Sequence, residues 1–482
     1  MLTPENAVLT DSVLDLPDNP REACGVFGIY DHPEAAKIAY FGLYALQHRG
    51  QESAGIAVAK DRRITTHNGM GLVSDVFKMR HLETLNGGSA IGHVRYSTTG
   101  SSTLVNAQPF AVHHMGYSYA LAHNGNLVNA HVLKHELEKD GSIFQTTMDS
   151  ELALHIFIKN LKHGFEPALI NMVEKLEGAY SFVLLTGKGE VVGIKDPNGL
   201  RPLCLGKLND HYVLASESCA LDLLQAEFIR ELEPGEIVII DKKGIRTLFC
   251  RQPRKRTFCI FEYIYFARPD STIYGRNVYL TRKAQGRQLA REAPVDADLV
   301  MPFPDSGNYA ALGYCEESGI PFEIGMIRNH YIGRTFIQPT QNMRDFGVRV
   351  KLNPVRELLR GKEIIIIEDS IIRGTTARTR IKALRELGVK KVHMRVSCPP
   401  HRFPCFYGID FSTRGELIAA SMSLKELQDY IGLDSLHYLS LEGLIESTIA
   451  GNESERETFC KACFDGCYPV AVDEGVSKGC LE

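Results

Sequence analysis

The segment Ile364-Ile-Ile-Ile-Glu-Asp-Ser-Ile-Ile-Arg-Gly-Thr-Thr376 decides the fold of the second half of the chain. Its four consecutive isoleucines predict a strand buried on both faces, as in a parallel sheet covered by helices. Glu368 and Asp369 follow at the carboxyl end of that strand, the edge where open α/β sheets bind ligands. Arg373-Gly-Thr-Thr376 then turns into a predicted helix, whose N-terminus favours a phosphate. A capped turn with solvated acids would explain the residues singly; together they favour a phosphate cradle beside two carboxylates that suit ribose hydroxyls, directly or through a metal.

Strands and helices alternate around this segment. The pattern predicts strands at 297–302, 321–326, 363–367 and 391–397, and helices at 308–318 and 375–387. This strand–helix–strand order predicts a parallel sheet.

The first half of the chain mixes strand-like runs with amphipathic helical patterns, which predicts a layered α/β domain up to about residue 240. Strand-like runs occur at 53–59, 90–96, 118–122, 180–186 and 212–216, with helical patterns at 35–46, 127–139, 149–161 and 166–176. The stretch 241–257 carries seven lysines and arginines and is interpreted as a solvated linker or domain edge. Residues from about 452 onward are polar and cysteine-rich and are interpreted as a tail.

Length and composition limit the classes of protein to consider. A chain of 482 residues predicts two or three domains. The net charge of −4 gives no reason to expect nucleic acid or an acidic membrane surface as a partner. The first 23 residues hold five acids against one base, unlike a secretory signal, so a cytoplasmic protein is expected. Its twelve cysteines are then expected to be reduced, and available for thiol chemistry or metal binding.

The segment at 364–376 resembles the PRPP-binding motif of type I phosphoribosyltransferases. That resemblance implies that Glu368 and Asp369 contact the ribose, although the closest amidotransferase relatives usually carry aspartate first. It also implies a loop that holds the 5′-phosphate, made of Ser370, Arg373, Gly374, Thr375 and Thr376. Pro304-Asp-Ser-Gly307 resembles the pyrophosphate loop of the family, which would place Ser306 near a Mg²⁺ ion shared with the two acids. The segment 331–351 resembles the family's hood loop.

Cys24 begins the first predicted strand, where a cysteine is usually a small core residue. Its context differs, because residues 24–217 resemble the class II glutamine amidotransferase domain, an N-terminal-nucleophile hydrolase. The resemblance rests on five ordered segments: Cys24-Gly-Val-Phe-Gly28, Leu46-Gln-His-Arg-Gly-Gln-Glu-Ser53, His93-Val-Arg-Tyr-Ser-Thr98, Ala122-His-Asn-Gly-Asn-Leu127 and Thr147-Met-Asp-Ser-Glu151.

This second resemblance assigns roles to individual residues. Cys24 would be the nucleophile and its own α-amino group the base, since an α-amine titrates near neutrality. Residues 1–23 would then be a propeptide that must be removed, although Ala23 stands where such relatives often carry glutamate. The Asn124 side chain and the Gly125 N–H would form the oxyanion hole. Arg95 and Asp149 would bind the α-carboxylate and α-ammonium of glutamine. Taken singly, a turn would also explain Asn124 and Gly125, a surface ion pair Arg95, and a helix cap Asp149. The histidines His48, His93 and His123 are interpreted as structural.

The cysteines of the second half suggest a metal site. Cys460-Lys-Ala-Cys463 supplies two thiols, and the neighbourhoods of Cys259 and Cys405 resemble those that supply [4Fe–4S] ligands in one branch of the same family. Four thiolates suit such a cluster, and zinc would accept the same set. Scattered reduced thiols are the third possibility, and Cys398 and Cys467 are close enough in sequence to be confused with ligands. Neither glutamine hydrolysis nor phosphoribosyl transfer, the reactions that these resemblances imply, transfers electrons. A cluster would therefore be structural.

Together, the two halves resemble the glutamine phosphoribosylpyrophosphate amidotransferase family. The resemblance implies an N-terminal-nucleophile αββα sandwich followed by a type I phosphoribosyltransferase domain with a parallel sheet. Expected boundaries are a propeptide at 1–23, an amidotransferase domain at 24–255, a transferase domain at 256–450 and a tail at 451–482. The implied reaction passes ammonia from glutamine to PRPP, giving 5-phosphoribosylamine, pyrophosphate and glutamate as purine synthesis begins.

The family also implies inhibition by purine nucleotides and a homo-oligomer, either a dimer or a tetramer. Neither nucleic acid nor a membrane is expected as a partner. Two rival functions remain at this stage. Glucosamine-phosphate or asparagine synthetase would share the first half but lack the segment at 368–376. A non-enzymatic PRPP or nucleotide sensor would keep the second half but would need neither a liberated Cys24 nor an oxyanion site at Asn124 and Gly125.

Overall fold

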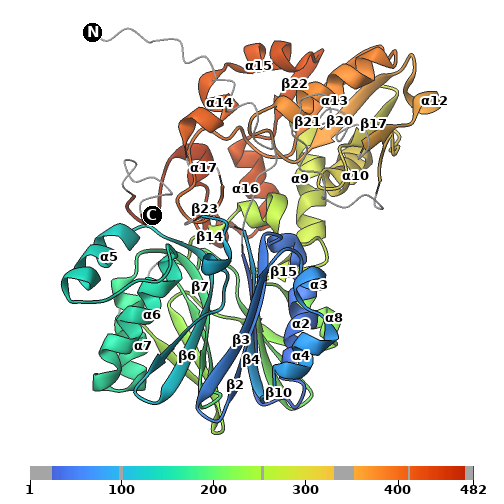
Figure 1. Ribbon diagram of the computed structural model, residues 1–482. Helices are drawn as coiled ribbons and strands as arrows, with labels where there is room; N and C mark the ends of the chain where they lie inside the picture. Colours follow the sequence, from blue (N-terminus) through green and yellow to red (C-terminus); the bar gives the residue numbers. More distant parts are fainter. Residues whose placement is uncertain are drawn as a thin grey trace, which may run out of the picture.

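The computed structural model describes residues 24–96, 101–250, 255–329, 352–410, 413–472 and 481. The predicted propeptide and hood loop lie outside these residues. Figure 1 shows two bodies joined along one face, with the N-terminal half below and the parallel-sheet half above. Within the described residues, no helix is both long enough and apolar enough to cross a membrane.

The N-terminal half is a sandwich of two antiparallel sheets. One sheet has the order β11 (Glu227–Glu231), β9 (Cys204–Leu208), β10 (His211–Ala215), β1 (Gly25–Ile29), β4 (Ser89–Arg95), β2 (Ser53–Lys60) and β3 (Arg63–Met70). The other has the order β13 (Gly244–Phe249), β12 (Glu236–Asp241), β8 (Val191–Lys195), β7 (Gly178–Thr186), β6 (Tyr117–Leu127) and β5 (Phe110–His114). A core of small and branched apolar side chains, among them Val26, Ile91 and Val183, fills the space between them.

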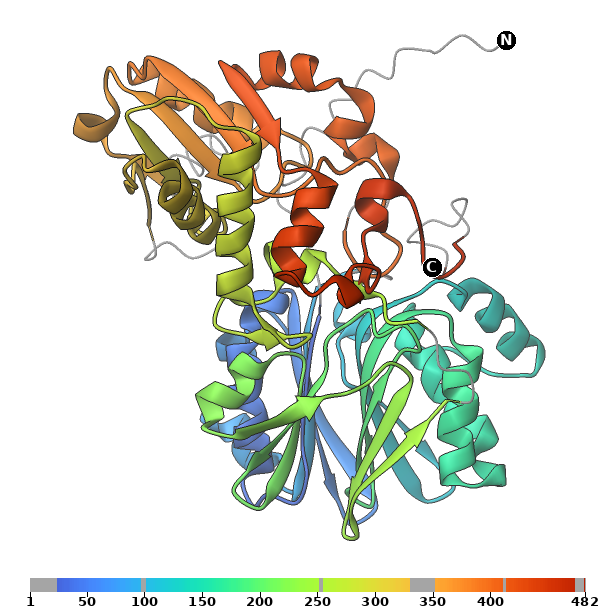
Figure 2. The same ribbon diagram turned by 180° about the vertical axis from the view of Figure 1, so that it is seen from behind.

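Helices cover the outer face of each sheet, which completes the αββα layering (Figures 1 and 2). The first sheet is covered by α2 (Ala35–Ala45), α3 (Val73–Val76), α4 (Met79–Thr84) and α8 (Ser218–Leu224). The second is covered by α5 (Ala130–Lys139), α6 (Asp149–Asn160) and α7 (Phe165–Lys175). Short 3₁₀ turns occur at Gln47–Arg49, Leu104–Asn106, Leu161–His163, Arg414–Glu416 and Glu453–Glu455. The predicted sandwich is therefore confirmed.

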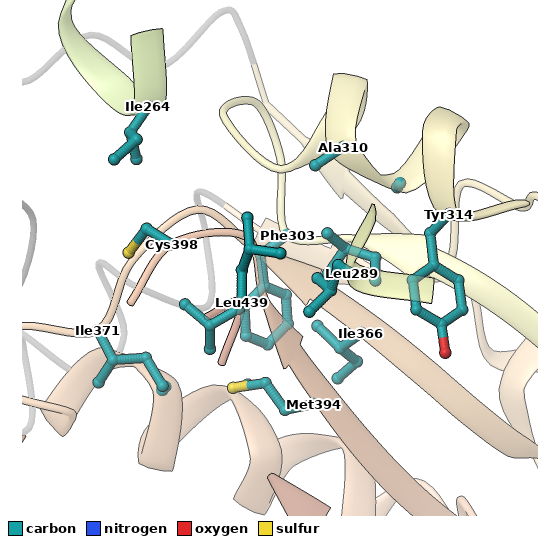
Figure 3. Packing of buried hydrophobic residues seen from close by; sticks show 14 of the residues in the cluster. Ile264, Leu289, Phe303, Ala310, Tyr314, Ile366, Ile371, Met394, Cys398 and Leu439 are labelled. Atoms are coloured by element: carbon teal, nitrogen blue, oxygen red, sulfur yellow. The ribbon is translucent and has the colours of Figure 1, made fainter. Parts of the chain in front are cut away.

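The second half is built on a wholly parallel sheet, as the alternating pattern predicted. Its order is β17 (Leu299–Pro302), β20 (Glu363–Glu368), β21 (Lys391–Val396) and β22 (Ser435–Tyr438). The helices are α9 (Val278–Glu292), α10 (Asn308–Ser318), α12 (Arg356–Leu359), α13 (Thr375–Glu386), α14 (Ile418–Ser421), α15 (Leu424–Ile431) and α16 (Leu441–Ile449). Figure 3 shows Ile366 of β20 packed among Leu289, Phe303 and Met394. All four isoleucines of β20 are fully buried, as expected for a central strand.

Short elements join the two halves. A π-helical turn, η4, spans Glu262–Phe266, and β14 (Phe258–Cys259) pairs in parallel with β23 (Phe459–Cys460). The remaining short elements are β15 (Thr272–Ile273), β16 (Arg276–Asn277), β18 (Met326–Arg328), β19 (Leu352–Pro354) and α17 (Ala462–Asp465). The predicted tail is therefore part of the fold, since β23 pairs with β14 and Leu481 is buried.

Three predicted elements differ from the observed ones. The strand expected at 321–326 is reduced to a single bridge between Phe322 and Val300, because Pro321 has no N–H and the chain then leaves the sheet. The helix expected at 127–139 begins at Ala130, because Leu127 still pairs in β6. The basic stretch at 241–257 is partly an edge strand, β13, and charged side chains suit such an edge because they discourage further pairing.

Candidate active sites

Cys24 lies directly before β1 and is 4% exposed. Its thiol donates to the Tyr96 carbonyl oxygen at 3.3 Å. Because β1 pairs with β4, with Gly25 opposite Val94, Cys24 sits at the end where β4 finishes in Arg95. The Arg95 side chain is buried, and its Nη1 donates to the Ser101 carbonyl at 3.3 Å. The first sheet therefore brings the predicted nucleophile and the predicted carboxylate-binding arginine together.

Asn124 and Gly125 lie in β6 of the facing sheet, so the turn considered for them is wrong. Asn124 is fully buried, and neither Oδ1 nor Nδ2 has a hydrogen-bond partner among the described residues. Leaving a buried amide unpaired costs about 1–3 kcal/mol. A buried amide without a partner therefore indicates a place where a ligand binds. Gly125 has φ +141°, and a Cβ there would lie 1.9 Å from the Ala179 carbonyl oxygen. Only glycine fits this position.

Asp149 begins α6 and is held by the same strand. Its Oδ1 lies 3.1 Å from His123 Nδ1, and its Oδ2 accepts from the Leu127 N–H at 3.0 Å. Burial alone would raise the pKa of Asp149, but His123 and the backbone donors outweigh burial and lower it, so the group is a carboxylate. A carboxylate has about four acceptor sites, so an ammonium group can still bind beside the contacts with His123, Leu127 and Ser150.

Two histidines connect these pieces. His93 of β4 places Nε2 2.8 Å from the His123 carbonyl oxygen, which links the two sheets. Burial lowers the pKa of His93 to about 3, so it stays neutral. The structural interpretation of His93 and His123 fits these contacts. All five predicted glutamine-site residues therefore gather at one end of the sandwich.

The predicted PRPP motif has the expected shape. Glu368 ends β20, and Gly374 adopts φ +73° immediately before α13, whose first turn begins at Thr375. The Ser306 hydroxyl hydrogen bonds to the Asp369 carboxylate, so the two loops predicted to share Mg²⁺ meet. Burial raises the pKa of Asp369, while the Ser306 and Ser370 hydroxyls act against that shift. Arg380 lies 3.8 Å from Glu368, and Arg373 pairs with Glu416.

The four cysteines predicted as cluster ligands line one small cavity. Cys259 and Cys460 face each other in the β14–β23 pair, and Cys405, Cys463 and Arg201 are among the other residues that line the cavity. Cys398 and Cys467 do not line it. Burial raises the pKa of Cys259 to about 12 and also holds the pKa values of Cys460 and Cys463 well above the usual range of a thiol. Among the described residues, no three histidine, cysteine or acidic side chains converge closely enough to hold a single metal ion.

The second half of the chain also contacts β6, the strand of Asn124 and Gly125. Asn126 Nδ2 donates to the Phe406 carbonyl at 2.9 Å, and a Cβ on Gly408 would lie 3.2 Å from the Gly125 carbonyl carbon. Glu217 and Glu262, which bind Arg49 beneath Cys24, were not singled out from sequence. Arg49 lies within one of the quoted segments, but isolated glutamates carry no pattern that would reveal them.

The fold and its paired sites define a glutamine amidotransferase joined to a phosphate-binding transferase domain. A family model described as "Glutamine amidotransferase domain" matches residues 93–223. The chain is 48% identical to an amidophosphoribosyltransferase of Synechococcus elongatus, covering 98% of this chain and 96% of the relative. The identity to a Staphylococcus aureus amidophosphoribosyltransferase is also 48%, over 94% and 92% of the two chains.

Comparison with solved structures indicates the same family. A glutamine PRPP amidotransferase from B. subtilis, complexed with ADP and GMP, matches with a TM-score of 0.90 and 46% identity, covering 95% of this chain and 100% of that one. A structure described as the allosteric regulatory enzyme of purine biosynthesis matches with a TM-score of 0.89 and 47% identity, covering 93% of this chain and 97% of that one. The chain therefore belongs to the amidophosphoribosyltransferase family and is an enzyme. Similarity over nearly the whole chain excludes both rival functions.

Proposed function

We propose that the chain hydrolyses glutamine at Cys24 and uses the ammonia to displace pyrophosphate from C1 of PRPP. The products are glutamate, pyrophosphate and 5-phosphoribosylamine, the start of de novo purine synthesis. The contact of residues 406–408 with Gly125 and Asn126 carries this proposal, because it brings the second half of the chain against the strand that holds the proposed oxyanion donors. Ammonia released there can reach the second site without being protonated and lost in water.

At the first site, the Cys24 thiol attacks the glutamine carboxamide after giving its proton to the freed α-amine. The developing oxyanion is stabilised by Asn124 Nδ2 and the Gly125 N–H, and this explains the unpaired Asn124 amide. Arg95 and Asp149 hold the α-carboxylate and α-ammonium of the substrate. The amine returns its proton to the leaving ammonia, and water then hydrolyses the thioester.

At the second site, Glu368 and Asp369 orient the ribose, and residues 370–376 receive the 5′-phosphate on the N-terminal turn of α13. Two carboxylates and the Ser306 hydroxyl, which meets Asp369, are oxygen ligands that suit Mg²⁺. When bound, Mg²⁺ would neutralise charge on the departing pyrophosphate. Ammonia attacks C1 as the C1–O bond to pyrophosphate breaks.

Product stoichiometry tests the coupling of the two sites. We expect one glutamate and one pyrophosphate for each turnover with both substrates, because ammonia passes from one site to the other. The measurement is parallel quantification of both products. Pyrophosphate released at the same rate without glutamine or ammonia would contradict the proposal, and so would glutamate released in large excess over pyrophosphate.

We also propose a [4Fe–4S] cluster held by Cys259, Cys405, Cys460 and Cys463. Their shared cavity supports this ligand set. Four thiolates are the ligand set that such a cluster needs, and zinc would accept the same set. The guanidinium of Arg201 in the lining suits the negative charge of a tetrathiolate site. The group would be structural, and it would tie residues 459–463 to β14 and to the segment at Cys405.

Iron and acid-labile sulfide analysis of anaerobically purified protein tests the cluster. We expect four irons and four sulfides per chain, the composition of the proposed [4Fe–4S] group. C405S should lose most of the iron and the visible absorbance, whereas C467S should keep both, because Cys467 is exposed and lies outside the cavity. One zinc per chain, or equal iron in the two variants, would refute the assignment.

Four further properties are proposed from the family alone: removal of residues 1–23, inhibition by purine nucleotides, a homo-oligomeric state and a cytoplasmic location. The ADP and GMP bound to the B. subtilis relative support the second of these.

A further inference from the structure

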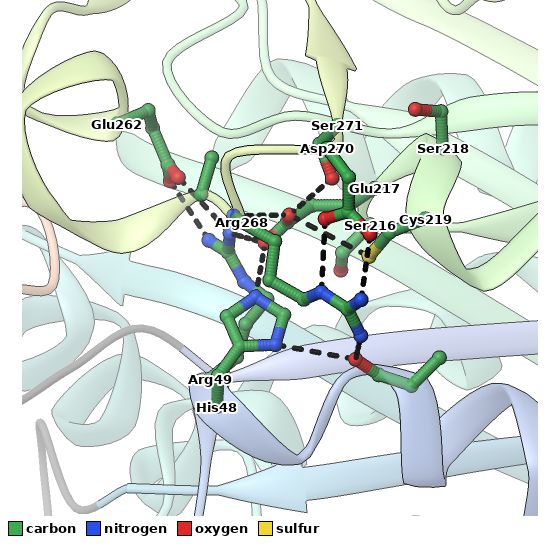
Figure 4. Close-up of polar contacts among 12 residues, drawn as sticks. His48, Arg49, Ser216, Glu217, Ser218, Cys219, Glu262, Arg268, Asp270 and Ser271 are labelled. Carbon is green, nitrogen blue, oxygen red and sulfur yellow. Dashed lines mark hydrogen bonds and ion pairs between the residues drawn. The ribbon is translucent and has the colours of Figure 1, made fainter. Parts of the chain in front are cut away.

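Arg49 forms fully buried ion pairs with Glu217 and Glu262 (Figure 4). Arg49 Nη1 and Nη2 donate to the two oxygens of Glu262 at 3.0 and 2.8 Å. Nη1 also donates to Glu217 at 2.5 Å. Arg49 and Glu217 belong to the sandwich, whereas Glu262 lies in η4 of the second half. A bidentate pair thus crosses from one half of the enzyme to the other.

The same guanidinium reaches the nucleophile. Arg49 Nε donates to the Cys24 carbonyl oxygen at 3.2 Å. That carbonyl is bonded to the Cα that carries both the thiol-bearing side chain and the α-nitrogen. Holding the carbonyl therefore fixes the two groups that the proposed reaction uses, relative to the oxyanion donors on β6.

Glu262 sets the orientation of this guanidinium. A bidentate carboxylate fixes the plane of an arginine head group, and that plane determines where Nε points. Without the Glu262 charge, Arg49 would be drawn toward Glu217 alone. Because Glu217 binds only Nη1, it does not fix the plane, and the bond from Nε to Cys24 would be lost or weakened.

A second contact leads from Glu262 to the oxyanion strand. Arg201 Nη1 donates to Glu262 at 3.2 Å, and its Nε and Nη2 donate to the Tyr407 carbonyl at 3.1 and 2.8 Å. Tyr407 lies between Phe406 and Gly408, the residues that contact Asn126 and Gly125. Glu262 therefore binds both Arg49, which contacts Cys24, and Arg201, which contacts the segment beside the proposed oxyanion hole.

We propose that Glu262, a residue of the transferase half, is a positioning residue for glutamine hydrolysis and acts through Arg49 on Cys24. The proposal rests on the assignment of Cys24 as the nucleophile. It implies that the glutaminase site is complete only when the transferase half is docked.

The test is the isosteric variant E262Q in the full-length enzyme. We expect kcat for glutamine hydrolysis to fall by about tenfold or more, because a small misplacement of a nucleophile is costly. The KM for glutamine should stay within about twofold, since Arg95 and Asp149 are untouched. Ammonia-dependent synthesis should be nearly unchanged, and that activity also shows that the variant is folded.

The matched control is E236Q. Glu236 is equally buried and binds Arg230 in a bidentate pair at 2.8 and 2.6 Å, but it lies in β12, away from Cys24. E236Q should leave kcat for glutamine unchanged. E262D, which keeps the charge, should recover part of the loss. The double variant R49Q/E262Q should be little slower than R49Q alone, because R49Q already removes the contact through which Glu262 acts.

A second readout separates this proposal from the role of Cys24 itself. An electrophilic diazoketone analogue of glutamine should alkylate Cys24 more slowly in E262Q than in E236Q. Alkylation of some other cysteine would overturn the assignment of Cys24, not that of Glu262. Equal alkylation and equal kcat in E262Q and E236Q would overturn the role of Glu262, and so would an equal loss of the glutamine- and ammonia-dependent activities.

Discussion

Replacing Cys24 with alanine is expected to abolish glutamine-dependent synthesis while leaving ammonia-dependent synthesis intact. Removing the nucleophile of an acyl-transfer site typically costs at least about 10⁴-fold in rate. Cys24 directly precedes β1, at the end where the neighbouring strand β4 finishes in Arg95. The transferase site, by contrast, is built from β17, β20 and their loops, so external ammonia can still react there. The measurement is pyrophosphate release with each nitrogen source.

Cys204 offers a matched control. It is another buried cysteine of the same sheet, in β9, and burial raises the pKa of its thiol, so it is a core residue. C204A should keep both activities, apart from a modest loss of stability. Loss of both activities in folded C24A protein would contradict the division of labour between the two sites.

Removal of residues 1–23 can be measured on the same purified protein. If the α-amine of Cys24 is the base, the active chain must begin at Cys24, and intact mass with N-terminal sequencing will show this directly. Active protein that retains residues 1–23 would require a different base for the same thiol.

Much of this architecture could be predicted from sequence, because its elements carry strong local patterns. Four isoleucines before two acids define β20, and the glycine at 374 defines the turn into α13. The αββα sandwich was predicted from resemblance, since five short segments fall in the same order as in the amidotransferase family. The cysteines at 259, 405, 460 and 463 were grouped in the same way, and the structure places them around one cavity.

Other features could not be predicted because they depend on contacts between distant parts of the chain. Glu262 is one acid in an otherwise apolar segment, and only the docked halves reveal that it binds Arg49 at a separation of 213 residues. Asn124 and Gly125 resembled a turn because Asn-Gly pairs favour turns locally. Pairing with Ser181 and Tyr180 of β7 overrides that preference and places both residues in a strand.

The second large effect is expected at Asp369, where alanine should remove synthesis from glutamine and from ammonia alike. We expect a loss of about 100-fold or more with either nitrogen source, the size typical of deleting one electrostatic contact in a reacting centre. Asp369 is almost fully buried at the carboxyl end of β20, and its carboxylate meets the Ser306 hydroxyl of the neighbouring loop. The carboxylate of the neighbouring Glu368 lies 3.8 Å from Arg380.

The control and the second readout make this test specific. Asp434 borders the same sheet at its opposite edge, where it accepts from the Val392 N–H, so D434A should keep synthesis within about twofold, as expected for a surface acid away from the site. Alkylation of Cys24 by the diazoketone should persist in D369A, which shows that the sandwich is intact. Normal ammonia-dependent turnover in D369A would refute the assignment.

Because both nitrogen sources converge on one electrophile, a residue that serves C1 of PRPP must affect both, whereas a residue that serves Cys24 affects only one. The contrast between C24A and D369A therefore assigns each residue to its half of the reaction without any measurement of ammonia transfer itself.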